Sequence, residues 1–178
     1  MVDVWAYYSN ADEVELFLNG KSLGTKSKQG DEMHIAWKVS YEPGTLKAIS
    51  RKNGKVVLTT EVKTAGAPAR IELTADRNTI LSNDNDLSYI TVKIVDKDGI
   101  MVPNADNDVK FTLSGADSFL AGVDNGSQTS HESFKADHRK AFNGLALAIV
   151  GAKSKAGKVK ITATSEGLPD ASLAITIK

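Results

Sequence analysis

The fold class follows from one stretch of the sequence, EVELFLNGKSLG at residues 13–24. Val14, Leu16 and Leu18 fall on every second position, which is the period of a β-strand with one buried face. Asn19-Gly20 then separates two apolar runs by two residues, as the turn of a β-hairpin does. The stretch therefore predicts two antiparallel strands joined by a tight turn.

The same period of two recurs along the rest of the chain. Apolar residues alternate with polar or small ones at residues 35–39, 90–94, 109–113, 159–163 and 173–177. Further Asn-Gly pairs at 53–54, 125–126 and 143–144 favour turns. Strands of this kind, separated by turn signals about every ten residues, are typical of an antiparallel β-sandwich. We therefore expect an all-β fold.

A domain boundary is expected in the stretch KTAGAP at residues 63–68, which is rich in small residues and breaks the alternation. We place one sandwich at residues 1–66 and a second at 67–178. A domain of about 65 residues buries only about 60% of the surface of its unfolded chain and is marginally stable alone. We therefore expect the first domain to be stabilised by packing against a neighbouring domain.

Composition excludes several classes of function. The 178 residues include 22 acidic and 22 basic side chains, so no basic excess points to nucleic acid. Cysteine is absent, which excludes disulfides, thiolate catalysis and cysteine-ligated zinc. No apolar run approaches the roughly 18 residues of a membrane span, so we expect no membrane insertion. Val2–Tyr8 already has the pattern of a strand, without a signal peptide, and we expect the chain to be cut from a longer protein.

Two groups of motifs resemble one enzyme family. YSNADEVELFLNGKSLG at 8–24 and WKVSYEPGTLKA at 37–48 resemble the immunoglobulin-like segment that follows the catalytic barrel in bacterial β-galactosidases of glycoside hydrolase family 2. VDNG at 123–126, SHESF at 130–134 and RKAFNG at 139–144 resemble the C-terminal sandwich domain of the same enzymes. The resemblance covers nearly the whole chain.

This resemblance implies two tandem immunoglobulin-like β-sandwich domains that serve as a non-catalytic accessory region. Their partners would be the catalytic barrel and the other domains of the same parent chain. The parent resembles a retaining glycosidase acting on β-galactosides, and it would be secreted or periplasmic. The two catalytic glutamates of the family lie in the barrel, and no position here matches their motifs. A barrel takes about 250 residues, more than this chain contains.

Possible catalytic and metal-binding residues have simpler interpretations. Glu13 and Glu15 share a strand face, which favours a solvated hairpin over a glycosidase acid pair. His131 and His138 are too far apart in sequence for the helical zinc pair, so we interpret them as surface imidazoles. Acidic loops can bind calcium, but aspartate also stabilises turns by local hydrogen bonds. The aspartates concerned are Asp84, Asp86, Asp96, Asp98, Asp106 and Asp108. We expect no catalytic, cofactor-binding or metal-binding residue.

The aromatic residues leave a second function open. Trp37 alternates with Ile35 and Val39, which predicts a core position. Trp5 and Tyr7 share the opposite face from Val4 and Ala6, and one of these two faces could be exposed. Sugar-binding modules stack pyranose rings on exposed aromatic side chains, so Trp5 and Tyr7 are candidate carbohydrate contacts. The alternatives to a structural accessory region are thus a carbohydrate-binding module and an adhesin-type sandwich repeat.

The polar stretch 127–141 interrupts the β pattern and is expected to be either a short helix or a long connection. For residues 127–142 we predict an ordered connection lying across the second domain. Burial of Phe134 and Phe142 would hold it in place, since each is worth about 1.5–3 kcal/mol when buried. Glu132 and Arg139 are the expected hydrogen-bonding pair.

Overall fold

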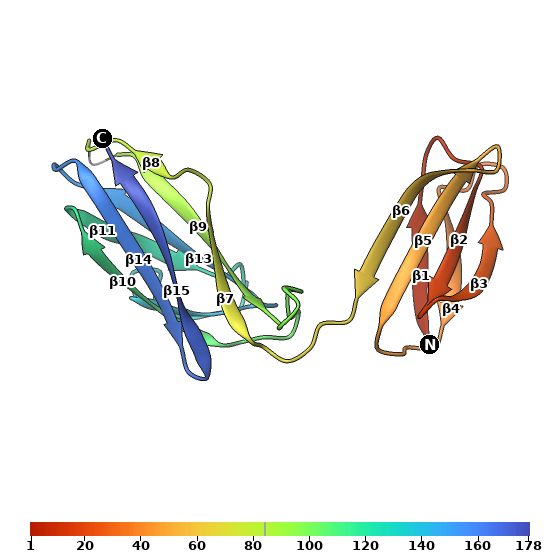
Figure 1. Ribbon diagram of the computed structural model, residues 1–178. Helices are drawn as coiled ribbons and strands as arrows, with labels where there is room; N and C mark the ends of the chain where they lie inside the picture. The colour runs from red at the N-terminus through yellow and green to blue at the C-terminus, as the bar shows by residue number, and fades with distance from the viewer. Residues whose placement is uncertain (84) are drawn as a thin grey trace. The chain divides into compact units, whose positions relative to one another are not determined.

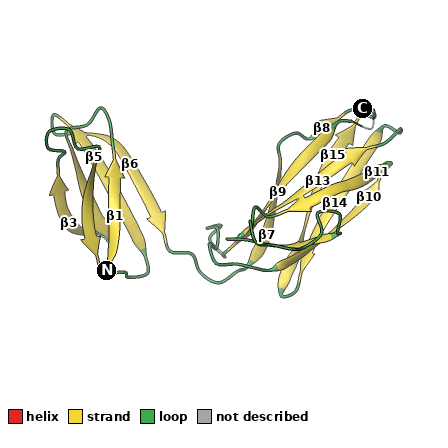
Figure 2. Ribbon diagram, turned by 180° about the vertical axis from the view of Figure 1, so that it is seen from behind, coloured by secondary structure: helices red, strands yellow, loops and turns green. Residues whose placement is uncertain are grey.

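The computed structural model describes residues 1–83 and 85–178, and in these residues it contains fifteen β-strands and no helix (Figures 1 and 2). The described part of the chain therefore has no helix that could cross a membrane. The all-β prediction is confirmed. Asp84, one of the aspartates considered for calcium, lies outside the described residues.

The strands are β1 Val2–Tyr7, β2 Glu13–Leu18, β3 Lys21–Lys26, β4 His34–Val39, β5 Thr45–Lys52, β6 Lys55–Lys63, β7 Arg70–Ala75, β8 Thr79–Ile80, β9 Leu87–Val95, β10 Asp108–Gly115, β11 Ser118–Asp124, β12 His138–Lys140, β13 Leu145–Ala152, β14 Gly157–Ser165 and β15 Leu168–Ile177.

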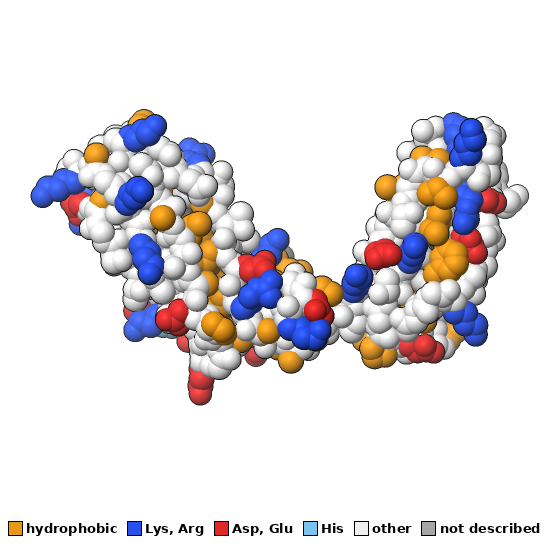
Figure 3. All heavy atoms as spheres, in the orientation of Figure 1, with side chains coloured by type: hydrophobic (Ala, Val, Ile, Leu, Met, Phe, Trp, Pro, Cys, Tyr) orange, Lys and Arg blue, Asp and Glu red, His pale blue; other side chains and the backbone are white. Residues whose placement is uncertain are grey.

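The chain divides into two compact units, Met1–Thr64 and Ala65–Lys178, which we call unit 1 and unit 2. The division falls within the KTAGAP stretch. On the face of the molecule that Figure 3 shows, acidic and basic side chains are interspersed over both units.

Unit 1 consists of a four-stranded sheet, ordered β3-β2-β5-β6, and a two-stranded sheet of β1 and β4. The side chains that alternate inward from the two sheets form one buried cluster of Val14, Leu16, Ile35, Trp37 and Val39. Trp37 is only 4% exposed, which confirms its predicted core position. Period-two alternation thus places one face of each sheet inside.

Asparagine and glycine form the hairpin turns of unit 1. Asn19 and Gly20 have φ of 51° and 81° between β2 and β3, and Asn53 and Gly54 have φ of 50° and 74° between β5 and β6. A two-residue turn that matches the strand twist needs positive φ at both central residues, which Asn and Gly tolerate best. The hairpins predicted from the two Asn-Gly pairs are confirmed.

Unit 2 pairs a five-stranded sheet, ordered β12-β10-β14-β15-β8, with a four-stranded sheet, ordered β11-β13-β9-β7. All pairings are antiparallel among the described strands except that of β15 with the two-residue strand β8. The larger core of the chain lies here and is built from β-branched and small residues, including Ile90, Val92, Ile94, Val109, Ala148, Val150, Ile161 and Ile175.

One aspartate of the acidic loops stabilises the start of unit 2. Asp96 is 2% exposed, and its carboxylate accepts the backbone N–H groups of Gly66 at 2.7 Å, Ile100 at 2.8 Å and Asp98 at 2.9 Å. The bond from Gly66 is the main cause that lowers the pKa of Asp96. At this residue the turn interpretation is therefore confirmed: the carboxylate holds the Asp96–Ile100 turn and the first residues of unit 2 together.

We expect the stability of unit 2 to decline at acid pH partly through Asp96. A carboxyl group with a pKa lowered by folding stabilises the protein fully above its ordinary pKa near 3.8. That stability is lost as the pH falls further, through the lowered pKa of the folded state. Asp96→Asn should lower the unfolding midpoint of unit 2 at neutral pH and flatten its decline below about pH 4. Circular dichroism melts over a pH series check this, with the exposed Asp170→Asn as control. An unchanged acid profile in Asp96→Asn would contradict the assignment.

Candidate functional site

A buried arginine organises the connection between β11 and β13. The Arg139 side chain is 1% exposed. Its guanidinium donates to the Glu132 carbonyl oxygen at 3.0 Å, to Asp124 Oδ1 at 3.2 Å and to Asn125 Oδ1 at 3.3 Å. The ring of Phe134 lies over the guanidinium, 5.1 Å from its central carbon. The predicted hydrogen bonding between Arg139 and Glu132 is present through the backbone carbonyl of Glu132, while its carboxylate lies 3.9 Å from Arg139 Nε.

The predicted burial of the two phenylalanines is wrong. Phe134 is 59% exposed and Phe142 is 44% exposed. Hydrogen bonds between backbone groups attach the connection instead: Val123 donates to Phe134 at 2.9 Å, Phe111 to Asp137 at 2.7 Å and Ala141 to Asn107 at 2.8 Å. Charged and backbone hydrogen bonds therefore replace apolar burial as the anchor. Of the two predicted forms, a short helix and a long connection, the chain adopts the connection, which ends in the short strand β12.

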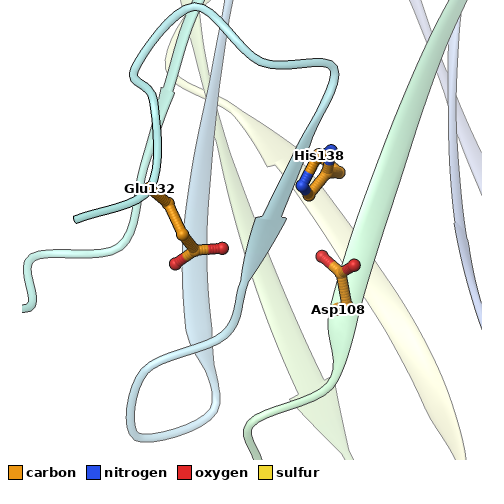
Figure 4. Close-up of side chains that lie close together, drawn as sticks. All are labelled: Asp108, Glu132 and His138. Carbon is orange, nitrogen blue, oxygen red and sulfur yellow. The ribbon is translucent and has the colours of Figure 1, made fainter. Parts of the chain in front are cut away.

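Asp108, Glu132 and His138, the residue before Arg139 in the chain, come together (Figure 4). One potential ligand atom from each residue lies within 4.8 Å of the others. Asp108 begins β10 and His138 begins β12, and these two strands are paired, while Glu132 comes from the connection. Two carboxylates and an imidazole are ligand types that a divalent metal ion accepts. Whether the cluster is free to bind a metal ion depends on the hydrogen bonds that its atoms already make.

Hydrogen bonds within the protein engage two members of the cluster, Glu132 and His138. Glu132 Oε1 accepts the N–H of Lys140 at 3.2 Å, and Oε2 accepts the hydroxyl of Ser130 at 2.9 Å. Burial raises the pKa of Glu132, but these bonds and the charge of Arg139 outweigh it and lower the pKa. Hydrogen bonding to Asp137 and the charge of Asp108 raise the pKa of His138. Since a metal ligand must be a neutral imidazole, the arrangement favours a charge-paired anchor for the connection.

Two of the other acidic candidates, Glu15 and Asp86, also have partners within the protein. Glu15 accepts the hydroxyl of Ser22 at 2.8 Å and pairs with Arg51 at 2.9 Å. The bond from Ser22 is the main cause that lowers the pKa of Glu15. Asp86 accepts the N–H of Leu81 at 2.9 Å and pairs with Arg77 at 3.3 Å. Asp86 thus makes the local hydrogen bonds predicted for the aspartates, whereas Glu15 is paired with Arg51 and is not the freely solvated side chain expected for it.

The second candidate site is an exposed aromatic face on the two-stranded sheet of unit 1. Trp5 is 58% exposed and Tyr7 is 63% exposed. The ring of His34, from the paired strand β4, lies 4.8 Å from that of Trp5 and 5.1 Å from that of Tyr7. We call Trp5, Tyr7 and His34 the aromatic face. An open hollow of about 490 Å³, lined by residues that include Lys26, Glu32 and Met33, shares His34 with it.

Sequence reasoning missed His34 of the aromatic face, and it named Asp108 and His138 without bringing them together. His34 precedes the inward-facing Ile35, so alternation within β4 already places its side chain on the outer face. The missing information was that β4 pairs with β1. Asp108 approaches His138 through the pairing of β10 with β12, which joins residues 30 positions apart and has no local signal.

Comparison with known proteins gives the family. Residues 71–174 match the family model described as glycoside hydrolase family 2 C-terminal domain 5, and residues 1–58 match a domain of unknown function, DUF4982. The chain is 51% identical over 175 residues to a β-galactosidase of Bacteroides ovatus, covering 98% of this chain and 20% of that protein. It is 29% identical over 170 residues to a β-glucuronidase of Formosa agariphila, covering 94% and 17%.

Solved structures agree with this assignment. A glycosyl hydrolase family 2 member from Bacteroides cellulosilyticus matches with a TM-score of 0.94 and 41% identity, over 99% of this chain and 23% of that one. A β-glycosidase from Bacteroides vulgatus matches with a TM-score of 0.87 and 32% identity, over 98% and 22%. The chain thus spans about one fifth of the length of these relatives. It belongs to glycoside hydrolase family 2, and residues 71–174 form the C-terminal domain 5 of that family.

Proposed function

We propose that the chain is a non-catalytic accessory region of a family 2 glycosidase, which supports and packs against the other domains of its parent. The observation that carries the proposal is that whole glycosidases match nearly all of this chain with only about a fifth of their own length. The carboxylates of Glu15, Glu132 and Asp86 support it, because they already accept hydrogen bonds within the protein. A retaining glycosidase instead needs two carboxylates about 5 Å apart that face a sugar-binding cleft.

The parent is proposed to act on β-galactosides and to be secreted or periplasmic. The 51% identity to a β-galactosidase favours this substrate over the β-glucuronides suggested by relatives at 38% and 29% identity. An adhesin-type repeat, the third sequence alternative, does not account for membership of a glycosidase family.

We expect the isolated chain to hydrolyse neither an aryl β-galactoside nor an aryl β-glucuronide. The reason is that the chain matches only about a fifth of whole glycosidases and is shorter than the roughly 250 residues of a catalytic barrel. The assay is run at high protein concentration, with the full parent enzyme as positive control. Turnover that survives repurification and follows the protein peak would contradict the proposal.

Carbohydrate contact is the second candidate function, and the exposure of Trp5 and Tyr7 on one sheet face favours it. We expect weak binding of galacto-oligosaccharides, in the millimolar range, because the face is open and a single stacked ring contributes little. Calorimetry should show this binding abolished by Trp5→Ala and retained in Tyr41→Ala, which removes an exposed aromatic ring at another position of unit 1. A low-micromolar dissociation constant that Trp5→Ala abolishes would instead make sugar binding the main function.

A further inference from the structure

The two sheets of unit 1 are unequal, and the smaller one leaves part of the larger one uncovered. Lys26 at the end of β3 donates to the Ala36 carbonyl oxygen of β4 at 2.6 Å, and its ammonium lies 5.5 Å from the ring centre of Trp37. β4 therefore lies over the β3 side of the four-stranded sheet. In both Figure 1 and Figure 2, β1 lies between β3 and β6, which form the two outer edges. The second edge of β1 has no partner among the described strands.

Apolar side chains of β6 point toward this uncovered region. Leu58 is opposite Ser50 and Val62 is opposite Leu46 in the β5–β6 register. Ser50 is buried and Leu46 packs against the core, so Leu58 and Val62 face the interior side of the sheet. They are nevertheless 61% and 64% exposed. Two large apolar side chains on an inward face, left in water, indicate a missing covering element.

The strand order identifies that element. In an immunoglobulin sandwich, strands A, B, E and D form one sheet, and the other contains C, F and G, with further strands beside C. β1 and β4 correspond to B and E, and the order β3-β2-β5-β6 corresponds to C′, C, F and G. Strand A is then absent. It precedes strand B in the chain and pairs with the edge of B that is free in β1.

We propose that a β-strand from the sequence preceding this chain in the parent enzyme pairs antiparallel with the free edge of β1 and covers Leu58 and Val62. The relatives have the length to supply it, since this chain spans about a fifth of them and the family model describes residues 71–174 as a C-terminal domain. A short hairpin into Val2 would connect the new strand, so its pairing is local and costs little loop entropy. The proposal rests on the proposed function only in treating the chain as part of a longer enzyme.

The first test compares the chain with a version extended at its N-terminus by about 20 residues of the parent, enough for one strand and a hairpin loop. The extension should raise the unfolding midpoint of unit 1 by roughly 10 °C. Tryptophan fluorescence measures this, because both tryptophans, Trp5 and Trp37, lie in unit 1. Hydrogen exchange should show new protection of amides in β1. An unchanged midpoint with unchanged exchange in β1 would overturn the proposal.

The second test uses two residues of β6 with matched exposure. Leu58→Ser should barely change the midpoint of the 178-residue chain but should lower that of the extended chain by several degrees. Val56→Ser is the control, because Val56 is 60% exposed but lies on the outer face of the sheet. It is opposite Arg51, and Arg51 pairs with Glu15 on that outer face. Val56→Ser should have the same small effect in both chains.

Other occupants of the face formed by Leu58 and Val62 would give different results. If a second copy covers this face, the 178-residue chain sediments as a dimer and Leu58→Ser makes it monomeric. If the surface of another parent domain covers it, Leu58→Ser destabilises the full parent but not the extended chain. Either result would contradict the proposal of an added strand. None of these results depends on the glycosidase assay, so failure of the proposed function and failure of this inference are distinguishable.

Discussion

Replacing Arg139 by methionine should lower the free energy of unfolding of unit 2 by roughly 3 kcal/mol. The substitution keeps much of the side-chain volume but removes the charged hydrogen bonds to Asp124, Asn125 and the Glu132 carbonyl, each worth about 1.5–3 kcal/mol in favourable cases. Phe134 also loses the cation that its ring covers. The connection 127–142 would detach, and its amides should exchange rapidly with solvent.

Urea unfolding measured by circular dichroism checks the Arg139→Met effect, and tryptophan fluorescence should show unit 1 unchanged. The control is Arg77→Met, since Arg77 is 54% exposed in its ion pairs with Asp76 and Asp86. A surface pair of this kind is worth less than about 1 kcal/mol. Equal effects of the two substitutions, or slow exchange of residues 127–142 in Arg139→Met, would show that Arg139 is not the anchor.

Replacing Trp37 by alanine should unfold unit 1 while leaving unit 2 folded. Deleting a buried tryptophan side chain costs about 3–5 kcal/mol, because the cavity adds to the lost burial. A unit of 64 residues with five residues in its buried cluster has little stability in reserve. The loss therefore exceeds what unit 1 can tolerate.

The matched control for Trp37→Ala is Trp5→Ala, which removes the same side chain from an exposed position on the neighbouring strand β1. It should change the stability of unit 1 by less than about 1 kcal/mol. Amide NMR spectra distinguish the units: Trp37→Ala should collapse the resonances of residues 1–64 to random-coil positions and leave those of 65–178 dispersed. Dispersed resonances throughout would mean that Trp37 is not the centre of the core.

Much of the fold was predictable because its signals are local. The side chains of a strand alternate between two faces, so Val14 and Leu16 identify their buried face without reference to other strands. Asn19-Gly20 and Asn53-Gly54 mark turns because few other residues adopt positive φ cheaply. Such features need no knowledge of which strand pairs with which.

The remaining features depend on pairing and on contacts between distant residues. The parallel pairing of β15 with β8 joins residues about a hundred positions apart, and a two-residue strand has no period to detect. The exposure of Phe134 was mispredicted because, outside strands, an aromatic ring can be held by a cation rather than by a core. The two-stranded sheet of β1 and β4 was equally undetectable in the sequence, since its size depends on the number of strands that each sheet receives.

The central claim is that this region supports a glycosidase without taking part in its chemistry. The most direct measurement is kcat/KM of the parent enzyme on an aryl β-galactoside, with Asp108→Asn, Glu132→Gln and His138→Asn introduced together. These residues form the cluster of potential acid, base and metal-binding groups found among residues 1–83 and 85–178. Assayed well below the unfolding midpoint, the triple variant should keep kcat/KM within about two-fold of the parent value. A loss of about a hundred-fold or more with an unchanged midpoint, the size expected for a missing acid–base group, would contradict the claim.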